Sequence, residues 1–212
     1  MSRSTWQRFA YLLIGMALIA PYGFLSGFVV PALEGGLGSD AAWAVAIALC
    51  FVALPILTGM LAAVRELEIG ATRRLLGAAI GDIETLHGQA SWARRWRSAV
   101  WFVAHLVVGG VIGFVTLVLP PAVVSAVFAP FTTGEVQLGR LDATVPGGPG
   151  SAWIVPVALL SPLALVYLVA ATGALLARVA PRLLGPSPAE RLAASQRHAV
   201  HLAERNRLAR EL

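Results

Sequence analysis

The sequence is 212 residues long, with 58% hydrophobic and only 13% charged residues, whereas about 25% of residues are charged in ordinary soluble domains. This composition excludes a water-soluble globular domain and favours a membrane protein. All 16 basic residues are arginine and the net charge is a modest +5, which is typical of arginines that flank membrane spans rather than of a nucleic-acid-binding surface. The single cysteine, Cys50, excludes an intrachain disulfide and a pair of thiol ligands to a metal.

Four long apolar stretches are expected to form membrane-spanning helices, because each is long enough to cross a hydrocarbon core about 30 Å thick. They cover residues 9–33, 41–64, 99–131 and 152–180. Arg3 and Arg8 precede the first stretch, which is longer than the apolar region of a secretory signal, so we interpret it as an uncleaved span. The sequence therefore predicts an all-α membrane protein with a four-helix transmembrane domain over residues 1–180 and a cytoplasmic segment over 181–212.

The segment 65–98, between the second and third spans, is polar and rich in arginine. We expect the helix of the second span to continue through Leu76 and to end near Gly77 or Gly81, because glycine is common just after a helix. Aromatic and basic side chains then alternate before the third span, and we predict that they anchor the chain at the lipid headgroups rather than bind nucleic acid. These predicted anchors are Trp92, Arg94, Arg95 and Trp96.

In the third span, Pro120 and Pro121 are expected to end or kink the helix. The loop at 131–151 is rich in glycine and proline, and hydrophobic residues alternate with polar ones on both sides of residues 139–140. This alternation predicts a small β-hairpin that includes Val136 and Val145.

The distribution of arginine predicts the topology. All but one of the arginines lie before the first span, in 65–98 or in 178–212, and the two opposite loops contain only Arg140. By the positive-inside rule, both termini are cytoplasmic.

The sequence also repeats internally. Ala-Tyr-Leu-Leu-Ile-Gly at 10–15 matches Ala-His-Leu-Val-Val-Gly at 104–109, residues 58–65 match 172–178, and Arg-Leu-Leu-Gly occurs at 74–77 and 182–185. Because both copies start on the same side, we predict two helical hairpins related as parallel repeats about an axis along the membrane normal.

Glycines in the spans suit close helix packing, and two pairs have small-xxx-small spacing, Gly23 with Gly27 and Gly109 with Gly113. The spans contain no Asp, Glu or Lys and only one histidine, His105. An ionisable residue within the membrane is a functional hypothesis by default, so His105 and Tyr11, which occupies the equivalent position in the first repeat, are candidate sensing residues. The alternative is a structural role in which His105 bonds to a neighbour or reaches water at the cytoplasmic interface.

His198 and His201 lack the spacing and the carboxylate partners of a metal site and are expected on solvated helix faces. We find no sequence pattern for a nucleotide site, a catalytic triad, a cofactor or a metal.

A final helix is predicted within 185–212. Ser187 suits the N-cap, Pro188 the first helical position and Glu190 the third, as in a capping box. Leu192, Ala199 and Asn206 recur every seven residues, and Ser195, Leu202 and Ala209 do so three residues later. Because this spacing places both sets on one seam, we predict a coiled-coil-like homodimer contact and a signal-relay role for Leu192, Ala199, Leu202, Asn206 and Ala209.

The run Glu-Arg-Asn-Arg-Leu-Ala-Arg-Glu-Leu at 204–212 resembles the approach to the phosphoacceptor site of bacterial sensor histidine kinases that pair with LuxR-type response regulators. In that family the run is followed at once by His-Asp, and Leu212 stands one residue short of that histidine. Residues 183–192 resemble the linker that precedes this helix in actinobacterial members, and the four repeated spans, with Asp142 to Pro146 in the outer loop, resemble the membrane sensor domain found ahead of such kinases. The resemblance implies a response regulator as partner, reached only through a kinase region beyond Leu212.

The leading hypothesis is therefore the transmembrane input region of a two-component histidine kinase in a bacterial plasma membrane, itself without catalytic residues. The alternatives are a small membrane transporter or permease subunit, and a membrane scaffold that recruits a soluble partner through the arginine-rich tail. Ion-coupled carriers normally need a buried carboxylate at mid-membrane, and the four predicted spans contain none.

Overall fold

The computed structural model describes residues 3–80, 92–139, 143–186 and 188–211. The chain is mostly helical, as predicted. The long helices are α1 (Arg3–Leu37), α5 (Trp92–Phe128), α6 (Ile154–Leu183) and α7 (Pro188–Glu211). The segment between α1 and α5 consists of α2 (Ser39–Ile47), the π-helix η1 (Ala48–Ala53), α3 (Leu54–Gly59), α4 (Ala62–Ala71) and the π-helix η2 (Thr72–Leu76).

Four helical segments of the described residues are long and apolar enough to cross a membrane, so the chain is a multi-pass membrane protein. They cover Arg3–Glu34, Ser39–Gly59, Trp92–Phe131 and Pro149–Leu183. The first, third and fourth are longer than predicted, because the arginine-bearing ends continue the same helices instead of lying in loops.

The second span differs from the prediction in its cytoplasmic half. The helix does not run on to Leu76, because Leu61 has an extended backbone (φ −70°, ψ 136°) that separates α3 from α4. The predicted end at Gly77 is correct: this residue follows η2 in the left-handed conformation, with φ 67°. Gly81, the other predicted end, lies outside the described residues. The break gives α4 its own direction, with Glu66 and Leu67 exposed and Glu68 and Ile69 buried.

Of the two outcomes expected at Pro120 and Pro121, an end of the helix is contradicted, since α5 continues through both residues to Phe128. Proline is tolerated inside apolar membrane helices where neighbouring groups satisfy the freed backbone. Beyond α5, the 3₁₀ turns η4 (Ala129–Phe131) and η5 (Pro149–Ser151) flank a small hairpin.

The predicted hairpin is present in the structure. Strands β1 (Glu135–Gln137) and β2 (Thr144–Pro146) are antiparallel, with Val136 opposite Val145. Residues 140–142, which include Arg140 and Asp142, lie outside the described part. Val145 packs with Ala126, Ile154 and Ala158 into a minor core that ties the hairpin to α5 and α6.

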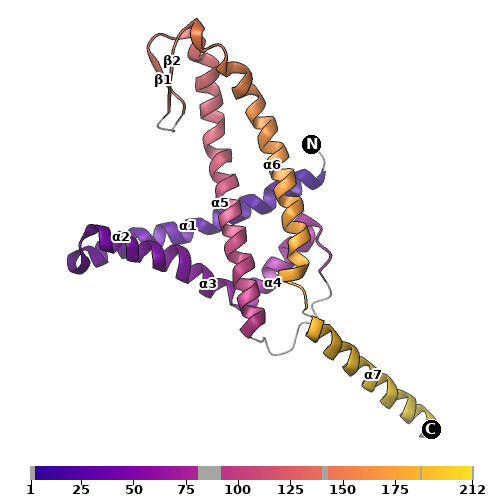
Figure 1. Ribbon diagram of the computed structural model, residues 1–212. Helices are drawn as coiled ribbons and strands as arrows, with labels where there is room; N and C mark the ends of the chain where they lie inside the picture. Colours follow the sequence, from indigo (N-terminus) through magenta and orange to yellow (C-terminus); the bar gives the residue numbers. More distant parts are fainter. Residues whose placement is uncertain (1–2, 81–91, 140–142, 187, 212) are drawn as a thin grey trace.

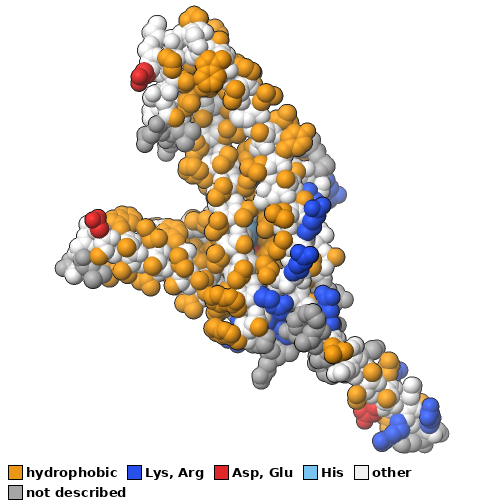
Figure 2. Space-filling view, viewed as in Figure 1, with side chains coloured by type: hydrophobic (Ala, Val, Ile, Leu, Met, Phe, Trp, Pro, Cys, Tyr) orange, Lys and Arg blue, Asp and Glu red, His pale blue; other side chains and the backbone are white. Residues whose placement is uncertain are grey.

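Figure 1 shows how the helices are arranged. Helix α1 crosses α5. From this crossing two helical pairs diverge: one consists of α1 with α2–α3, the other of α5 with α6. Helix α7 extends away from both pairs. The main hydrophobic core lies at the crossing and includes Tyr11, Leu12, Ile69, Trp101 and Leu184. Apolar side chains cover most of the visible surface of both diverging pairs, as expected for surfaces that face lipid (Figure 2).

Candidate functional site: a buried carboxylate at the helix crossing

Two glycines allow α1 and α5 to cross at very short range. A Cβ atom on Gly15 would lie 2.6 Å from the His105 carbonyl oxygen, and one on Gly109 would lie 2.6 Å from the Leu12 carbonyl oxygen. Any larger residue would therefore push the helices apart, as in other small-residue contacts between membrane helices. At Gly27, by contrast, an added Cβ atom would have no neighbour within 4 Å, so the Gly23/Gly27 spacing does not mark a contact at this residue.

The crossing brings Tyr11 and His105 together. Their rings stack with centroids 3.9 Å apart and planes 5° apart, and both residues are fully buried. The two candidate sensing residues from the sequence thus form one contact. Burial excludes the interpretation in which His105 reaches water at the cytoplasmic interface, whereas the interpretation in which it bonds to a neighbour agrees with the geometry described next.

Glu68, on α4, is the centre of the cluster. Its carboxylate accepts hydrogen bonds from the Tyr11 hydroxyl at 2.9 Å and from the Trp101 indole nitrogen at 3.1 Å. His105 Nδ1 lies 2.9 Å from Oε1 and 3.1 Å from Oε2 of the same carboxylate. The Thr72 hydroxyl donates to the Tyr11 hydroxyl at 3.4 Å. Since Glu68 is only 6% exposed, it is a buried carboxylate on α4 that is held by side chains from α1 and α5.

The partners of His105 restrict where its protons can lie. His105 Nε2 is 2.9 Å from the Tyr11 carbonyl oxygen, which can only accept, so Nε2 must carry a proton. Nδ1 faces a carboxylate, so a proton must also lie between Nδ1 and Glu68, on one or the other. The pair is therefore either an imidazolium with a carboxylate or a neutral imidazole with a carboxylic acid. In both forms it has no net charge.

Sequence reasoning did not identify Glu68. We assigned it to a polar connecting segment, because the second span was defined by its uncharged residues. One signal could have revealed it: Arg65, Glu68, Ile69 and Thr72 have the i, i+3, i+4, i+7 spacing of a single helix face, and all four are buried. The buried carboxylate weakens one argument against a transporter, since the fold supplies the group that the four predicted spans lack.

Arg65, one turn before Glu68, contacts the far end of α6. Its buried guanidinium donates through NH2 to the carbonyl oxygen of Leu184, the C-cap residue of α6. Carbonyl groups at a helix C-terminus lack partners within the helix and favour a positive charge. Arg97 adds a longer contact from α5, with 3.5 Å between its NH1 and the Arg182 carbonyl oxygen. The helix that carries Glu68 is thus directly bonded to the point where the chain leaves α6.

The predicted membrane anchors do not share one environment. Trp92 and Trp96 are 70% and 47% exposed, and Arg95 is also exposed. Arg94 is buried. In the single chain its side chain is therefore not accessible to lipid headgroups, whereas we expected it to be accessible.

The predicted relay seam is uncovered in the single chain. Leu192, Ala199, Leu202, Asn206 and Ala209 all lie on α7 and are all exposed. Ser187, the predicted N-cap, and the side chains of Glu190, His198 and His201 lie outside the described part of the structure.

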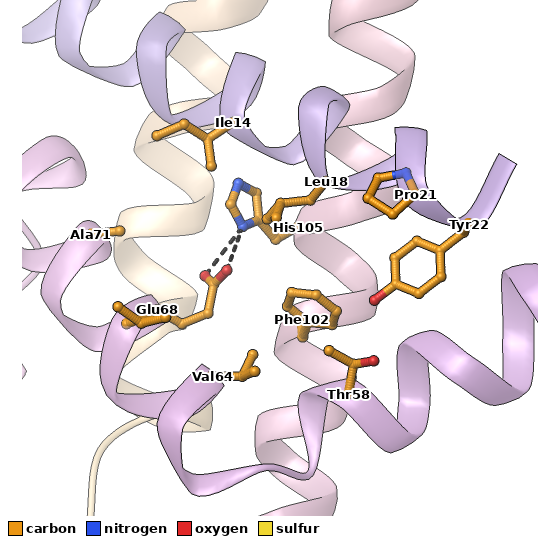
Figure 3. Close-up of a pocket in the computed structure, with 11 residues that line it drawn as sticks. Ile14, Leu18, Pro21, Tyr22, Thr58, Val64, Glu68, Ala71, Phe102 and His105 are labelled. Atoms are coloured by element: carbon orange, nitrogen blue, oxygen red, sulfur yellow. Dashed lines mark hydrogen bonds and ion pairs between the residues drawn. The ribbon is translucent and has the colours of Figure 1, made fainter. Parts of the chain in front are cut away.

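A pocket of about 360 Å³ adjoins the cluster (Figure 3). It lies between α1, α3, α4 and α5, and its walls are almost entirely apolar, with Leu18 and Phe102 among them. Glu68 and His105 form one side, while Tyr22 and Thr58 lie on the other. The pocket can therefore hold an apolar group beside a buried acid–base pair.

Comparison of the chain with protein-family models, with curated proteins and with solved structures finds no match. Among the residues that the structure describes, no group of three or more His, Cys, Asp and Glu residues could hold a metal ion. The fold and the site together define a multi-pass helical membrane protein with a buried polar cluster at a helix crossing.

Proposed function

We propose that this chain is the transmembrane input region of a bacterial two-component sensor histidine kinase, which relays a signal from the membrane to a cytoplasmic dimerisation helix. The observation that carries the proposal is the hydrogen bond from Arg65 to the Leu184 carbonyl oxygen. It joins α4, which holds the buried carboxylate, to the end of α6, two residues before the Pro186 linker to α7. The likeness of residues 204–212 to the approach of a phosphoacceptor histidine supports the same proposal.

The relay requires two arrangements of the helices. A stimulus that binds one arrangement better than the other shifts the equilibrium between them, and a stimulus without such a preference shifts nothing. A displacement of α4 at Glu68 would move Arg65 and with it the C-terminal end of α6. The resulting movement of α7 would change how its exposed seam pairs in a homodimer, and in kinases of the class that residues 204–212 resemble this alters autophosphorylation of the histidine.

The distribution of charge supports cytoplasmic termini. On the face shown in Figure 2, arginines gather around the lower part of α6 and along α7, whereas acidic side chains lie near the far ends of both diverging pairs and also on α7. Arginine-rich ends are retained in the cytoplasm.

Corresponding glycine contacts support the two-hairpin repeat. Gly59 packs on Phe102 of α5, and Gly173 packs on Arg8 of α1. In the sequence repeat, Gly59 corresponds to Gly173 and Phe102 corresponds to Arg8. The second helix of each repeat (α3 or α6) therefore contacts the first helix of the other repeat (α5 or α1) at equivalent positions. Tyr11 and His105, also equivalent, stack on each other at the crossing.

Disulfide cross-linking of α7 tests the relay. In a Cys50→Ala background in native-like membranes, Leu202→Cys on the seam is expected to cross-link into dimers, whereas the exposed Glu204→Cys, on the opposite side of the heptad, is not. Arg65→Met removes the hydrogen bond to Leu184 and is expected to change the yield of dimers cross-linked through Leu202→Cys at least twofold. Arg74→Met, an exposed arginine of η2, is the matched control and should leave the yield unchanged. Equal cross-linking at 202 and 204, or no response to Arg65→Met, would contradict the proposal.

One observation favours the second candidate, a small transporter or permease subunit: Glu68 and His105 form a buried proton-holding pair within the helices. Reconstituted liposomes that contain a pH-sensitive dye separate the two functions. Proton flux that is lost in Glu68→Gln would support the transporter, whereas the sensor predicts no flux above that of empty liposomes.

A further inference from the structure

Exposed apolar side chains line the pocket beside Glu68. Ile14 and Leu67 are among them and are 41% and 74% exposed. The lining residues of α1, α3 and α5 belong to candidate membrane spans. A molecule that enters between these side chains would therefore come from the lipid phase rather than from water.

The size of the pocket limits its occupant. A volume of about 360 Å³ is near the lower end of the range, about 300–1,000 Å³, that small-molecule sites occupy. It suits a small molecule with a single apolar chain, and it is too small to enclose a two-chain lipid.

The polar end of the pocket selects a hydrogen-bond donor. A carboxylate can accept about four hydrogen bonds. Tyr11, Trp101 and His105 occupy three of these positions, so one acceptor position of Glu68 is left for a ligand. Because the Glu68–His105 pair has no net charge, it offers no strong attraction to an ion, and a neutral hydroxyl is the donor that fits.

Tyr22 adds a hydroxyl on the opposite side of the pocket (Figure 3). The Thr58 hydroxyl nearby already donates to the Leu54 carbonyl oxygen at 2.8 Å, so its oxygen can still accept a hydrogen bond. The pocket thus combines apolar walls with a few fixed polar groups, which is the usual composition of a ligand site.

We propose that this pocket binds a small, neutral, lipid-soluble compound with a hydroxyl group, an alcohol or a phenol, with its hydroxyl against Glu68 and its apolar part between α1, α3 and α5. That this compound is the stimulus rests on the proposed function, whereas the binding of the compound to the pocket does not. Bound there, it would bridge α4 to α1 and α5 and favour one packing of α4.

Photolabelling of the full chain tests the binding. The protein is reconstituted in phosphatidylcholine vesicles with a decanol that carries a diazirine, and the labelled peptides are identified by mass spectrometry. Labels are expected on Leu18, Leu67 and Phe102. Unlabelled decanol should compete about three- to tenfold better than methyl decyl ether, because one hydrogen bond in such a site is worth a few-fold in affinity.

Two variants examine the site itself. Leu18→Trp places a large side chain in the pocket while it leaves Glu68 in the sequence, and it should remove most of the labelling. Leu160→Trp, on the exposed surface of α6, is the control and should leave it unchanged. Glu68→Gln should reduce the preference for decanol over the ether; since this variant can also destabilise the fold, Leu18→Trp provides the independent test.

Uniform labelling of lipid-facing residues, equal competition by the ether or no effect of Leu18→Trp would overturn the proposal. The signalling role is tested separately, by measuring the yield of the Leu202→Cys cross-linked dimer with and without decanol. Labelling of the pocket without a change in the cross-link would retain the site and reject the compound as the stimulus.

Discussion

At the scale of single residues, Glu68 differs most from an ordinary surface glutamate. Its carboxyl group accepts hydrogen bonds from Tyr11 and Trp101, shares a proton with His105 and is almost completely buried. Burial of a carboxyl group costs several kcal/mol when it is charged, and the loss is offset only when its oxygens find partners. Tyr11, Trp101 and His105 are these partners, so each of them also depends on Glu68.

We therefore predict that Glu68→Ala is strongly destabilising. The substitution leaves buried donors of Tyr11, Trp101 and His105 unpaired, and removal of one partner of a buried pair costs about 3–5 kcal/mol. Glu68→Gln, which keeps one acceptor oxygen, should cost less. The measurement is the midpoint of thermal unfolding in detergent micelles. Glu66→Ala, two residues away and exposed, is the control and should stay within about 0.5 kcal/mol of the unmutated protein. Equal midpoints for the two alanine variants would argue against the role given to Glu68.

At the scale of elements, the crossing of α1 and α5 determines the geometry of the site. Gly15 and Gly109 allow the backbones to approach until Tyr11 and His105 stack, and α4 then places Glu68 against both side chains. The break at Leu61 matters equally, since it gives α4 a direction different from that of α3.

Alanine at the crossing is therefore expected to destabilise the fold. Gly15→Ala and Gly109→Ala overpack the contact at a cost of about 1–3 kcal/mol, and they should also separate Tyr11 from His105. Gly27→Ala, at a helical position with open space around it, is expected to be neutral or to stabilise by up to about 1 kcal/mol because alanine favours a helix. Thermal unfolding measures all three variants. The explanation fails if Gly15→Ala and Gly27→Ala behave alike.

At the scale of the whole molecule, the distribution of arginines predicts which ends of the helices lie on the cytoplasmic side of the membrane. Glu135 lies on the hairpin beyond α5, and Glu204 lies on α7. In a Cys50→Ser background in intact cells, a membrane-impermeant maleimide should label Glu135→Cys directly and Glu204→Cys only after permeabilisation. Both positions are exposed, so burial does not explain a difference between them. Labelling of Glu204→Cys in intact cells would place α7 outside and remove the basis of the relay.

Much of the architecture was predictable from the sequence, because lipid imposes a simple requirement. A stretch that crosses the membrane must satisfy its own backbone hydrogen bonds and avoid charge, so long uncharged runs identify helices without knowledge of their neighbours. The hairpin with Val136 opposite Val145 and the helix end at Gly77 were also predicted correctly, since both depend on local patterns. The break at Leu61 was missed, although α3 ends at Gly59 two residues earlier, because this glycine lies inside a long uncharged run that we assigned to one continuous helix.

The sequence by itself thus determined the class of protein and the four spans to within seven residues at each end. It also identified two members of the site, Tyr11 and His105, through their equivalent positions in the repeat. Only the tertiary structure decided that these two stack, that Glu68 joins them from α4 and that Arg65 of the same helix reaches the end of α6. The physical reason is that hydropathy is a property of each segment alone. The partner of a buried charge, however, depends on how segments that are distant in the chain pack together. No local sequence pattern contains this information.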